Sequence, residues 1–377
     1  MKQFLKKVIP AILYLPSKKS IVFESNPEFT CNSLPVYEEM VRRGIDKDYQ
    51  IYWLVEDKTK YSNSDLNVKF LNYEEQGFDK FKKFLILSFS KCLVFTNRFL
   101  FKIQRNQFVI NLSHGMPLKN TPGYVEGDTC DYVVLTSDTF KQSMSEALEV
   151  PIEKTISLGY PRTDVFKRQT DARKKMNIQD DNKLIVWMPT FRRRKDSKKS
   201  VTTDYDFGIP LIDTEEKFDS LNEQLKVNKC ILVVKLHPVE DVSNKNLKDY
   251  SNIYFFNDTM LNEHGTTTYE LLADSDALLT DYSTVYYDYL LMNKPIGLVI
   301  NDLEEYSKKI GFALGEYKDF MKGSYIENMN DFDVFIENLH KGIDPDEKGR
   351  EWARKQYCQF TDFNSTNRVV DFIMEHI

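Results

Sequence analysis

The chain of 377 residues contains little cysteine, glycine or proline. Its five cysteines form an odd number and none lies at C-x-x-C spacing, which argues against a disulfide scaffold or a zinc ribbon and favours reduced thiols in an intracellular protein. With 14 glycines and 13 prolines, a collagen-like or low-complexity chain is excluded. The P-loop, the G-x-G-x-x-G fingerprint, the G-x-S-x-G elbow and the H-E-x-x-H zinc motif are also missing.

The sequence also lacks a long hydrophobic run at its N-terminus. The apolar stretch from Val8 to Leu15 is much shorter than the roughly 20 residues that span a bilayer, and no small-residue cleavage site of a signal peptide follows it. Lysines flank this stretch at positions 2, 6, 7, 18 and 19. Residues 1–18 therefore suggest a peripheral contact with an anionic membrane surface; the alternative is a helix packed on the protein with its lysines in solvent.

Charge of one sign does not dominate the chain. The net charge is −6, and this acidic excess argues against a nucleic-acid partner, which would require a basic face. Between Arg162 and Lys199, however, 13 basic residues accompany 5 acidic ones, so this segment is locally basic. The abundant aromatics, among them 26 Phe and 21 Tyr, predict a folded chain with a sizeable core.

Strand-like apolar runs alternate with helical patterns along most of the chain. Helical patterns include Pro35–Arg43, Phe78–Ser88 and the stretch Glu351–Ile377. The alternation predicts an α/β fold with parallel sheets. The expected strands are Ser20–Ser25, Gln50–Val55, Cys92–Thr96, Phe108–Ser113, Tyr132–Thr136, Lys183–Met188, Cys230–Leu236, Ile253–Phe256, Ala277–Thr280 and Ile296–Ile300.

The apolar pattern weakens near residues 165–180, which predicts two Rossmann-like domains. We expect an N-terminal α/β domain over residues 19–170, a second α/β domain over 171–350, and C-terminal helices over 351–377 that pack back toward the first domain. Two such domains would face a cleft, and ligands of these folds bind at the carboxyl ends of strands.

Five segments at such strand ends carry the candidate chemistry. His114 follows the run Phe108–Ser113, where an imidazole can take a proton from a hydroxyl. Gly115 next to it would let a ligand approach the backbone. The alternative is a turn built on Gly-x-Pro with an incidental histidine.

The second and third segments place arginines near possible phosphate positions. Arg162 lies in a turn that begins at Gly159, after the strand-like run Thr155–Leu158. It would contact a phosphate or fix a hinge, while Asp164 would cap the following helix or orient Arg162. Thr190 and Arg192 follow the run Lys183–Met188, where a phosphate would lie. A solvated charged loop is the alternative for the arginine run.

The remaining two segments lie in the second half. His237 ends the run that begins at Cys230; its alternative is a histidine satisfied in the core. Ser283 and Thr284 stand where a strand meets a helix, and free N–H groups at a helix N-terminus bind phosphate. Asp288 lies in that helix, where it would bind a ribose or polyol hydroxyl; the alternative for the segment is a simple N-cap.

Together these segments resemble the CDP-glycerol glycerophosphotransferase family, the teichoic acid primases and polymerases of bacterial cell walls. The resemblance extends over about residues 20–370, and the family has the two-domain GT-B architecture. Met116 and Thr284 stand where the family commonly has Thr and Ser. The matching strings are His114-Gly115-Met116-Pro117-Leu118-Lys119, Gly159-Tyr160-Pro161-Arg162-Thr163-Asp164, Pro189-Thr190-Phe191-Arg192, Lys235-Leu236-His237-Pro238 and Thr280-Asp281-Tyr282-Ser283-Thr284, with Asp288-Tyr289 beyond.

The resemblance implies a transferase that moves a polyol phosphate from a CDP-polyol to a hydroxyl of a lipid-linked saccharide or polyol phosphate, with release of CMP. It implies His114 as base and His237 on the donor phosphates. CDP-glycerol or CDP-ribitol is then a substrate, and no cofactor or metal is expected. The protein would work at the cytoplasmic face of the membrane, with homo-oligomers possible. Substrate contacts are expected from Gly115, Met116, Pro117, Lys119, Arg162, Thr190, Arg192, Ser283, Thr284 and Asp288.

Two rival functions fit the same pattern of strand-end residues. One is a GT-B glycosyltransferase or sugar-nucleotide epimerase, which uses similar phosphate binding but transfers or remodels a sugar. The other is a polyanion-binding membrane adaptor without turnover. Two histidines and an arginine at strand ends are more than binding alone requires, which favours an enzyme.

Overall fold

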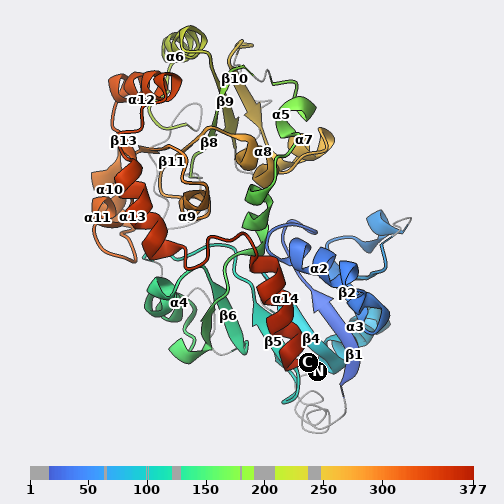
Figure 1. The fold of residues 1–377 in the computed structure, drawn as a ribbon. Helices are drawn as coiled ribbons and strands as arrows, with labels where there is room; N and C mark the ends of the chain where they lie inside the picture. Colours follow the sequence, from blue (N-terminus) through green and yellow to red (C-terminus); the bar gives the residue numbers. More distant parts are fainter. Residues whose placement is uncertain are drawn as a thin grey trace. The chain divides into compact units, whose positions relative to one another are not determined.

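A computed structural model describes residues 17–62, 66–98, 100, 102–120, 129–178, 181–190, 209–236 and 248–377. The chain divides into two compact units (Figure 1). Unit 1 takes its residues from Met1–Met116, Pro122–Asp164 and Gln359–Ile377, and unit 2 from Pro117–Thr121 and Val165–Cys358. Each unit is built on one parallel sheet, so the predicted α/β fold with two parallel sheets is confirmed.

Unit 1 holds a seven-stranded sheet in the order β3-β2-β1-β4-β5-β6-β7. All of its neighbouring strands run parallel. The strands are β1 (Lys18–Phe23), β2 (Gln50–Val55), β3 (Lys69–Asn72), β4 (Ser90–Phe95), β5 (Phe108–Asn111), β6 (Tyr132–Leu135) and β7 (Thr155–Ser157). Its helices are α2 (Ser33–Arg42), α3 (Gly77–Phe89), α4 (Lys141–Leu148) and α14 (Ser365–His376), with 3-10 turns η1 (Ile45–Lys47), η2 (Lys58–Tyr61), η3 (Asp138–Phe140) and η4 (Ile152–Lys154).

Unit 2 holds a six-stranded parallel sheet in the order β10-β9-β8-β11-β12-β13. Its strands are β8 (Lys183–Met188), β9 (Cys230–Lys235), β10 (Ile253–Phe256), β11 (Ala277–Thr280), β12 (Ile296–Val299) and β13 (Ser324–Ile326). Its helices are α5 (Ala172–Lys175), α6 (Glu215–Val227), α7 (Asp258–Glu263), α8 (Thr268–Asp274), α9 (Val285–Tyr289), α10 (Leu303–Lys309), α11 (Tyr317–Phe320), α12 (Met329–Lys341) and α13 (Glu347–Tyr357); η6 is Leu290–Met292, and η5 (Pro161–Lys167) joins the two units along the chain.

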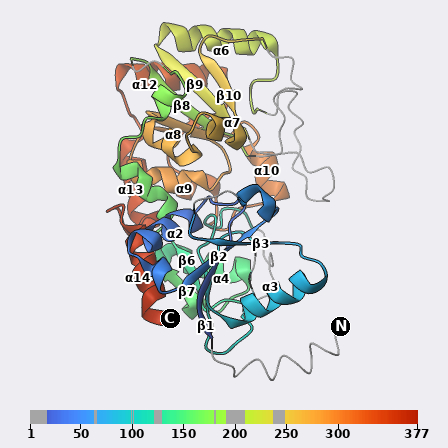
Figure 2. The same ribbon diagram turned by 90° about the vertical axis from the view of Figure 1, so that its right-hand side faces the viewer.

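The core of unit 2 shows why its sequence forms these layers. Helix α12 buries Phe332, Phe335, Ile336 and Leu339, at the i, i+3, i+4 and i+7 spacing of one helix face. Helices α6 and α12 pack against each other, with α6 on β9 and α12 on β13; both are labelled in the upper part of Figure 2. Together with β8, β9 and β11 they form one hydrophobic cluster around Trp187. Strands β9, β11 and β12 are buried along their whole length, as expected for parallel strands covered on both faces.

The ten expected strands are all present, with ends that differ by up to two residues. The short strand β7 corresponds to the strand-like run Thr155–Leu158, whereas β3 and β13 were not predicted from the sequence. Both lie at the edge of a sheet, and each buries only one side chain completely. An edge strand with one buried position lacks the continuous apolar run by which the inner strands are recognised.

Helix α14 returns to unit 1 more than 150 residues after the chain has left it. It packs against α2, and the carboxylate of Asp164 accepts the first N–H groups of the helix, from Ser365 at 3.0 Å and Thr366 at 2.7 Å. These N–H groups have no partner inside the helix. Asp164 therefore caps α14, a helix distant in sequence, and not the segment that directly follows it.

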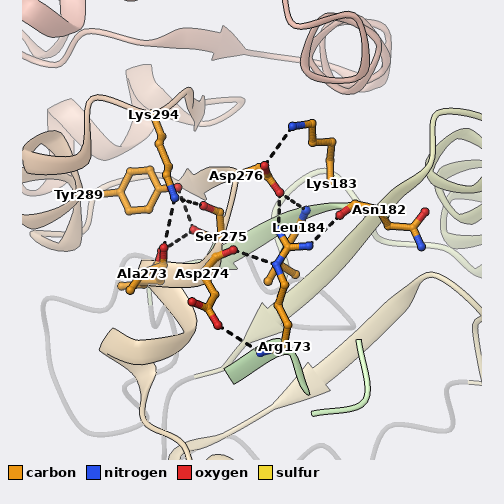
Figure 3. A network of polar contacts seen from close by, with 11 residues as sticks. Arg173, Asn182, Lys183, Leu184, Ala273, Asp274, Ser275, Asp276, Tyr289 and Lys294 are labelled. Atoms are coloured by element: carbon orange, nitrogen blue, oxygen red, sulfur yellow. Dashed lines mark hydrogen bonds and ion pairs between the residues drawn. The ribbon is translucent and has the colours of Figure 1, made fainter. Parts of the chain in front are cut away.

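A polar network joins strands of the unit 2 sheet at their amino-terminal ends (Figure 3). Arg173 pairs with Asp276 and donates from Nε to the carbonyl of Asp274 at 3.0 Å. Asp276 also accepts the N–H of Leu184 at 2.8 Å. Burial opposes ionisation of Asp276, but this hydrogen bond and the charges of Arg173 and Lys183 lower the pKa of its carboxyl below the ordinary value. The network thus ties the starts of β8 and β11 together.

Across the described ranges, no helix has both the length and the apolar content that crossing a membrane demands.

Gly159 tests the docking of α14. Its φ is +80°, and an added Cβ would lie 2.3 Å from Oγ of Ser365. Gly159→Ala should therefore lower the free energy of unfolding by clearly more than the ~1–2 kcal/mol cost of a left-handed alanine alone. Gly265→Ala is the matched control, because Gly265 has a φ of +69° with open space around its Cβ position. Equal losses for the two variants in urea denaturation would contradict this account.

Candidate active site

Each sheet changes its winding direction once. In unit 1 this occurs between β1 and β4, and in unit 2 between β8 and β11. Ligands of open α/β sheets bind beyond the carboxyl ends of the strands at such switch points. In both units a buried carboxylate stands at this position, Glu24 after β1 and Asp281 after β11, and both are 0% exposed.

Glu24 connects the two central strands of unit 1. Its Oε2 accepts the N–H of Thr96 at 3.1 Å and of Asn97 at 3.0 Å, both directly after β4. Its Oε1 accepts the hydroxyl of Tyr73 at 3.0 Å. Burial raises the pKa of the Glu24 carboxyl, and these hydrogen bonds act against that increase. The carboxylate supplies acceptors to backbone N–H groups that would otherwise have no partner in the interior.

The loop after β5 presents His114 through a sharp turn. Ser113 has a φ of +56°, and its N–H donates to Oδ1 of Asn111 at 2.8 Å. Asn32 donates to the carbonyls of Leu112 at 3.1 Å and Ser113 at 2.7 Å, so the loop is anchored from α2 as well. The side chain of His114 is exposed, as a group that meets a substrate must be.

The surroundings of His114 favour its neutral form. Although the side chain is accessible to solvent, protein atoms packed around the ring disfavour the charged form, and the nearby Arg162 guanidinium adds repulsion; both lower the pKa of the imidazole below 6.5. A contact with the backbone of Thr96 acts in the opposite direction. In its neutral form the imidazole carries a lone pair on one ring nitrogen.

Arg162 supports the histidine loop. Its guanidinium Nη1 donates to the carbonyl of His114 at 2.7 Å and to Sγ of Cys31 at 3.0 Å, and its backbone N–H donates to Oδ1 of Asn32 at 3.2 Å. The residue is 8% exposed. Arg162 thus binds the loop and contributes to the lowered pKa of His114. The phosphate contact of Arg162 stays a prediction.

The loop after β11 in unit 2 is organised by Asp281. Its Oδ1 accepts the N–H of Thr190 at 2.9 Å and of Tyr282 at 2.7 Å, as well as the Thr190 hydroxyl. The carbonyl of Asp281 accepts the hydroxyl of Tyr317 at 2.7 Å. Thr190 and the segment that begins at Tyr282 are therefore brought together at the carboxyl ends of the neighbouring strands β8 and β11.

Ser283 and Thr284 lie at the start of α9 and are partly exposed. The carbonyls of Ser283 and Thr284 accept the N–H groups of Tyr286 and Tyr287, so the helical turn begins here. Asp288 is 1% exposed, and its Oδ2 accepts the hydroxyl of Tyr269 at 2.6 Å. The contact of Asp288 with a polyol hydroxyl stays a prediction.

The predicted segment His114–Lys119 is divided between the two units. His114, Gly115 and Met116 belong to unit 1, and Pro117–Thr121 belong to unit 2. There Lys119 pairs with Phe312 in an antiparallel bridge, flanked by the bonds Asn120 N–H to Gly311 O at 3.2 Å and Ala313 N–H to Leu118 O at 3.0 Å. Lys119 lies over the ring of Tyr306. Met116 is 2% exposed, so its side chain packs in the interior.

Two predicted site residues, Arg192 and His237, lie outside the described residues, as do residues 1–16 of the N-terminal segment. The basic segment Arg162–Lys199 is described only in part. Within that part Arg162, Arg173 and Lys183 bond to carbonyls or carboxylates of the protein itself. These contacts tie their charges to the fold. Across the described ranges, no group of three or more His, Cys, Asp or Glu residues gathers in a way suited to a metal ion.

Glu24, Asn32 and Lys235 were not among the predicted site residues. Lys235 ends β9 and its Nζ pairs with Oδ2 of Asp258 at 2.8 Å. A polar residue directly after a buried run was the available signal for Glu24 and Lys235. The backbone partners of Glu24 lie more than 70 residues away along the chain, and no sequence pattern indicates them.

Known proteins are similar to this chain in sequence and in fold. A teichoic acid poly(glycerol phosphate) polymerase of Bacillus spizizenii is 26% identical over 95% of this chain and 92% of its own length. A teichoic acid glycerol-phosphate transferase of Staphylococcus aureus is 23% identical over the full length of both chains. A teichoic acid poly(ribitol-phosphate) polymerase of B. spizizenii is 27% identical over 82% of this chain, which spans about half of that relative (49%).

Among solved structures, the wall teichoic acid polymerase TagF superposes with a TM-score of 0.74 at 21% identity, over 95% of this chain and 89% of that chain. A UDP-GlcNAc 2-epimerase of Neisseria meningitidis shares the fold with a TM-score of 0.52 at 13% identity, over 94% and 99% of the two chains. The predicted GT-B-like fold is thereby confirmed. The model of the CDP-glycerol:poly(glycerophosphate) glycerophosphotransferase family matches residues 8–375, and the chain belongs to this family of transferases.

Proposed function

We propose that the protein transfers glycerol phosphate from CDP-glycerol to a hydroxyl of a lipid-linked saccharide or polyol-phosphate acceptor, releasing CMP, in the synthesis of teichoic acid or a related surface polymer. The observation that carries the proposal is the exposed imidazole of His114, held with a lowered pKa at the carboxyl edge of a parallel sheet. Family membership selects phosphotransfer over sugar transfer or epimerisation, because the fold alone is shared with both.

In the proposed reaction an oxygen of the acceptor attacks the β-phosphorus of the donor. A new phosphorus–oxygen bond forms, the bond from that phosphorus to the bridging oxygen breaks, and CMP leaves with the electron pair. The lone pair of His114 takes the proton of the attacking hydroxyl. Thr190, Ser283 and Thr284, at strand and helix ends in unit 2, are proposed to hold the donor phosphates, and Arg192 and His237 to stabilise the growing charge.

CDP-ribitol is the second candidate donor. The relatives include glycerol-phosphate and ribitol-phosphate polymerases at 26% and 27% identity, so similarity does not separate the two polyols. Met116, where the family commonly has Thr, packs in the interior and is an unsuitable contact for distinguishing them. Thr284 is partly exposed and is the better candidate for a contact that distinguishes CDP-glycerol from CDP-ribitol.

Turnover tests the role of His114. We expect CMP release from CDP-glycerol in the presence of a lipid-linked acceptor, and a loss of about 10²–10⁴-fold in His114→Ala. His340→Ala is the matched control, because His340 is exposed on α12 away from any strand end, and it should retain the wild-type rate. Parallel reactions with CDP-ribitol and UDP-sugars identify the donor. A wild-type rate in His114→Ala would remove His114 from the role of base.

The pH profile tests the electrostatics of the loop. His114 accepts a proton only when neutral, so kcat/KM should fall as the pH drops through its pKa, which lies below 6.5. Arg162→Gln removes a repelling charge and should move this acidic limb to higher pH. Arg168→Gln, an exposed arginine in unit 2, serves as the charge control and should leave the limb in place. A limb that does not move in Arg162→Gln would contradict the assigned cause.

A peripheral contact with the cytoplasmic leaflet of a bacterial membrane is part of the proposal. The N-terminal lysines that suggest it lie mostly outside the described residues, but helix α3 supplies independent support. Phe78 is 78% exposed and Phe81 45% exposed, with rings 6.5 Å apart, and Lys80 and Lys82 beside them are exposed too. Apolar rings next to lysines on a surface helix suit the interface of an anionic bilayer.

Flotation with vesicles that contain phosphatidylglycerol tests this contact. Phe78→Asp combined with Phe81→Asp should weaken vesicle binding about tenfold or more, because two partly buried rings are lost from the lipid. Val227→Asp changes an equally exposed apolar side chain on α6 in unit 2 (74% exposed) and should have no effect. Unchanged flotation of the double variant would exclude α3 as the membrane contact. Equal binding of the wild type to neutral vesicles would show that the lysines do not contribute to binding.

A further inference from the structure

Asn32 is a buried amide that binds backbone groups on two distant segments of unit 1. Its side chain is 0% exposed. Its Nδ2 donates to the carbonyls of Leu112 at 3.1 Å and Ser113 at 2.7 Å, and its Oδ1 accepts the N–H of Arg162 at 3.2 Å. A side-chain amide offers both donors and an acceptor, so this one residue joins segments that lie 80 and 130 positions further along the chain.

The place of Asn32 in its own helix does not account for these bonds. Asn32 directly precedes α2, in the N-cap position, where an asparagine side chain commonly accepts an N–H of the first helical turn. Among the residues of α2, all of which the structure describes, none provides such a bond to Asn32. Its amide is used on the two distant segments instead, so helix capping is not the reason for an asparagine at this position.

The two carbonyls that Asn32 binds lie on either side of an uncommon turn. Ser113 has a φ of +56°, in the left-handed region that residues with a side chain rarely adopt. Such a conformation persists where the surrounding contacts determine it. Asn32 binds the carbonyls of Leu112 and Ser113, and the N–H of Ser113 donates to Oδ1 of Asn111 at 2.8 Å. Asn32 therefore helps to impose the sharp turn that directly precedes His114.

The same contacts hold the backbone on both sides of His114. The peptide group before His114 contains the Ser113 carbonyl, which Asn32 binds. The peptide group after it contains the His114 carbonyl, to which Nη1 of Arg162 donates at 2.7 Å. Because peptide groups are planar and only φ and ψ rotate, holding both groups fixes the direction of the Cα–Cβ bond of His114. Asn32 thus binds one of these groups directly and also binds the residue that holds the other.

We propose that Asn32 is a positioning residue for His114: by binding the carbonyl of Ser113 and the N–H of Arg162, it fixes both peptide groups that flank His114 and so directs the imidazole at the acceptor hydroxyl. The proposal rests on the proposed function in one respect, the role of His114 as base. It assigns to Asn32 no contact with a substrate.

A purely structural role for Asn32 is the rival explanation, because its bonds also join the start of α2 to other parts of unit 1. The two explanations differ in whether Asn32 acts through His114. A positioning residue matters only while the group that it positions is present, whereas a loss of stability lowers the rate in any background. A double-mutant cycle separates these cases.

The rate experiment uses the full-length protein and CMP release. Asn32→Asp keeps the shape of the side chain, but a carboxylate only accepts hydrogen bonds and has no donor for the two carbonyls. It should lower kcat about 10–100-fold, the scale of loss when a catalytic group is displaced by about 1 Å. The KM for the CDP-polyol should stay within about threefold, because the proposed donor contacts lie in unit 2. In a His114→Ala background the same change should alter the residual rate less than about twofold.

Asn252→Asp is the matched control. Asn252 directly precedes β10, and its Nδ2 donates to the carbonyl of Cys230 at 2.9 Å, so it is an amide that holds a backbone carbonyl at the amino-terminal ends of strands in unit 2. Its replacement should lower the melting temperature without changing kcat. If Asn32→Asp lowers the rate by the same factor with and without His114, the positioning role is overturned. The same holds if Asn252→Asp reproduces the loss of kcat.

The ring signal of His114 gives a readout that does not require activity. In protein labelled with ¹³C-histidine, and with the signal assigned by its loss in His114→Ala, the wild type should show one ring signal. Asn32→Asp should show several signals or one broadened by exchange, because a loop without these bonds adopts more than one conformation. Asn252→Asp should leave the His114 signal unchanged.

Asn32→Ala keeps the test decisive if Asn32→Asp does not fold, because it removes the same bonds without adding a charge and should change the His114 signal in the same way. An unchanged His114 signal in either folded variant overturns the proposal. A wild type that releases no CMP overturns the proposed function alone, and the ring signal then still decides whether Asn32 positions His114.

Discussion

The need to satisfy backbone groups where two parallel strands diverge is the constraint on which both units depend. At the switch point of each sheet the neighbouring strands send their loops in different directions, so the first N–H groups after the strands have no partner in the ladder. Glu24 and Asp281 meet this need with buried carboxylates. Glu24 accepts two N–H groups from the loop of the neighbouring strand, and Asp281 accepts one from the neighbouring loop and one from its own. The position that most requires an internal acceptor is also the one where α/β folds bind their ligands.

The same solution leaves the two sites with different neighbours. The loop after β5 in unit 1 carries an exposed imidazole, His114. Packing around the ring and the charge of Arg162 both lower its pKa, and Arg162 also bonds to the carbonyl of His114. Around Asp281 the fixed turn leads to hydroxyl groups at Thr190 and Ser283. Unit 1 therefore carries an exposed imidazole after β5, and unit 2 carries hydroxyl groups at the carboxyl ends of β8 and β11.

The sequence was most informative about the centre of each sheet. Runs such as Gln50–Val55 and Lys183–Met188 were predicted with the ends that the structure shows, because every residue after the first in these two strands is apolar. The edge strands β3 and β13 escaped prediction, since a single buried side chain leaves almost no pattern. His114 could be selected because a strand end is visible in the sequence. Glu24 and Asp164 could not be assigned their roles, since their partners lie about 72 and 201 residues away.

The return of α14 to unit 1 has a consequence for the order in which a ribosome can complete this protein. Gly159 and Asp164 emerge with the first half of the chain, but the helix that covers one and is capped by the other is made last. During synthesis, unit 1 therefore lacks helix α14 until the residues of unit 2 have been made. A chain that ends before residue 365 would lack the helix that packs on Gly159 and is capped by Asp164.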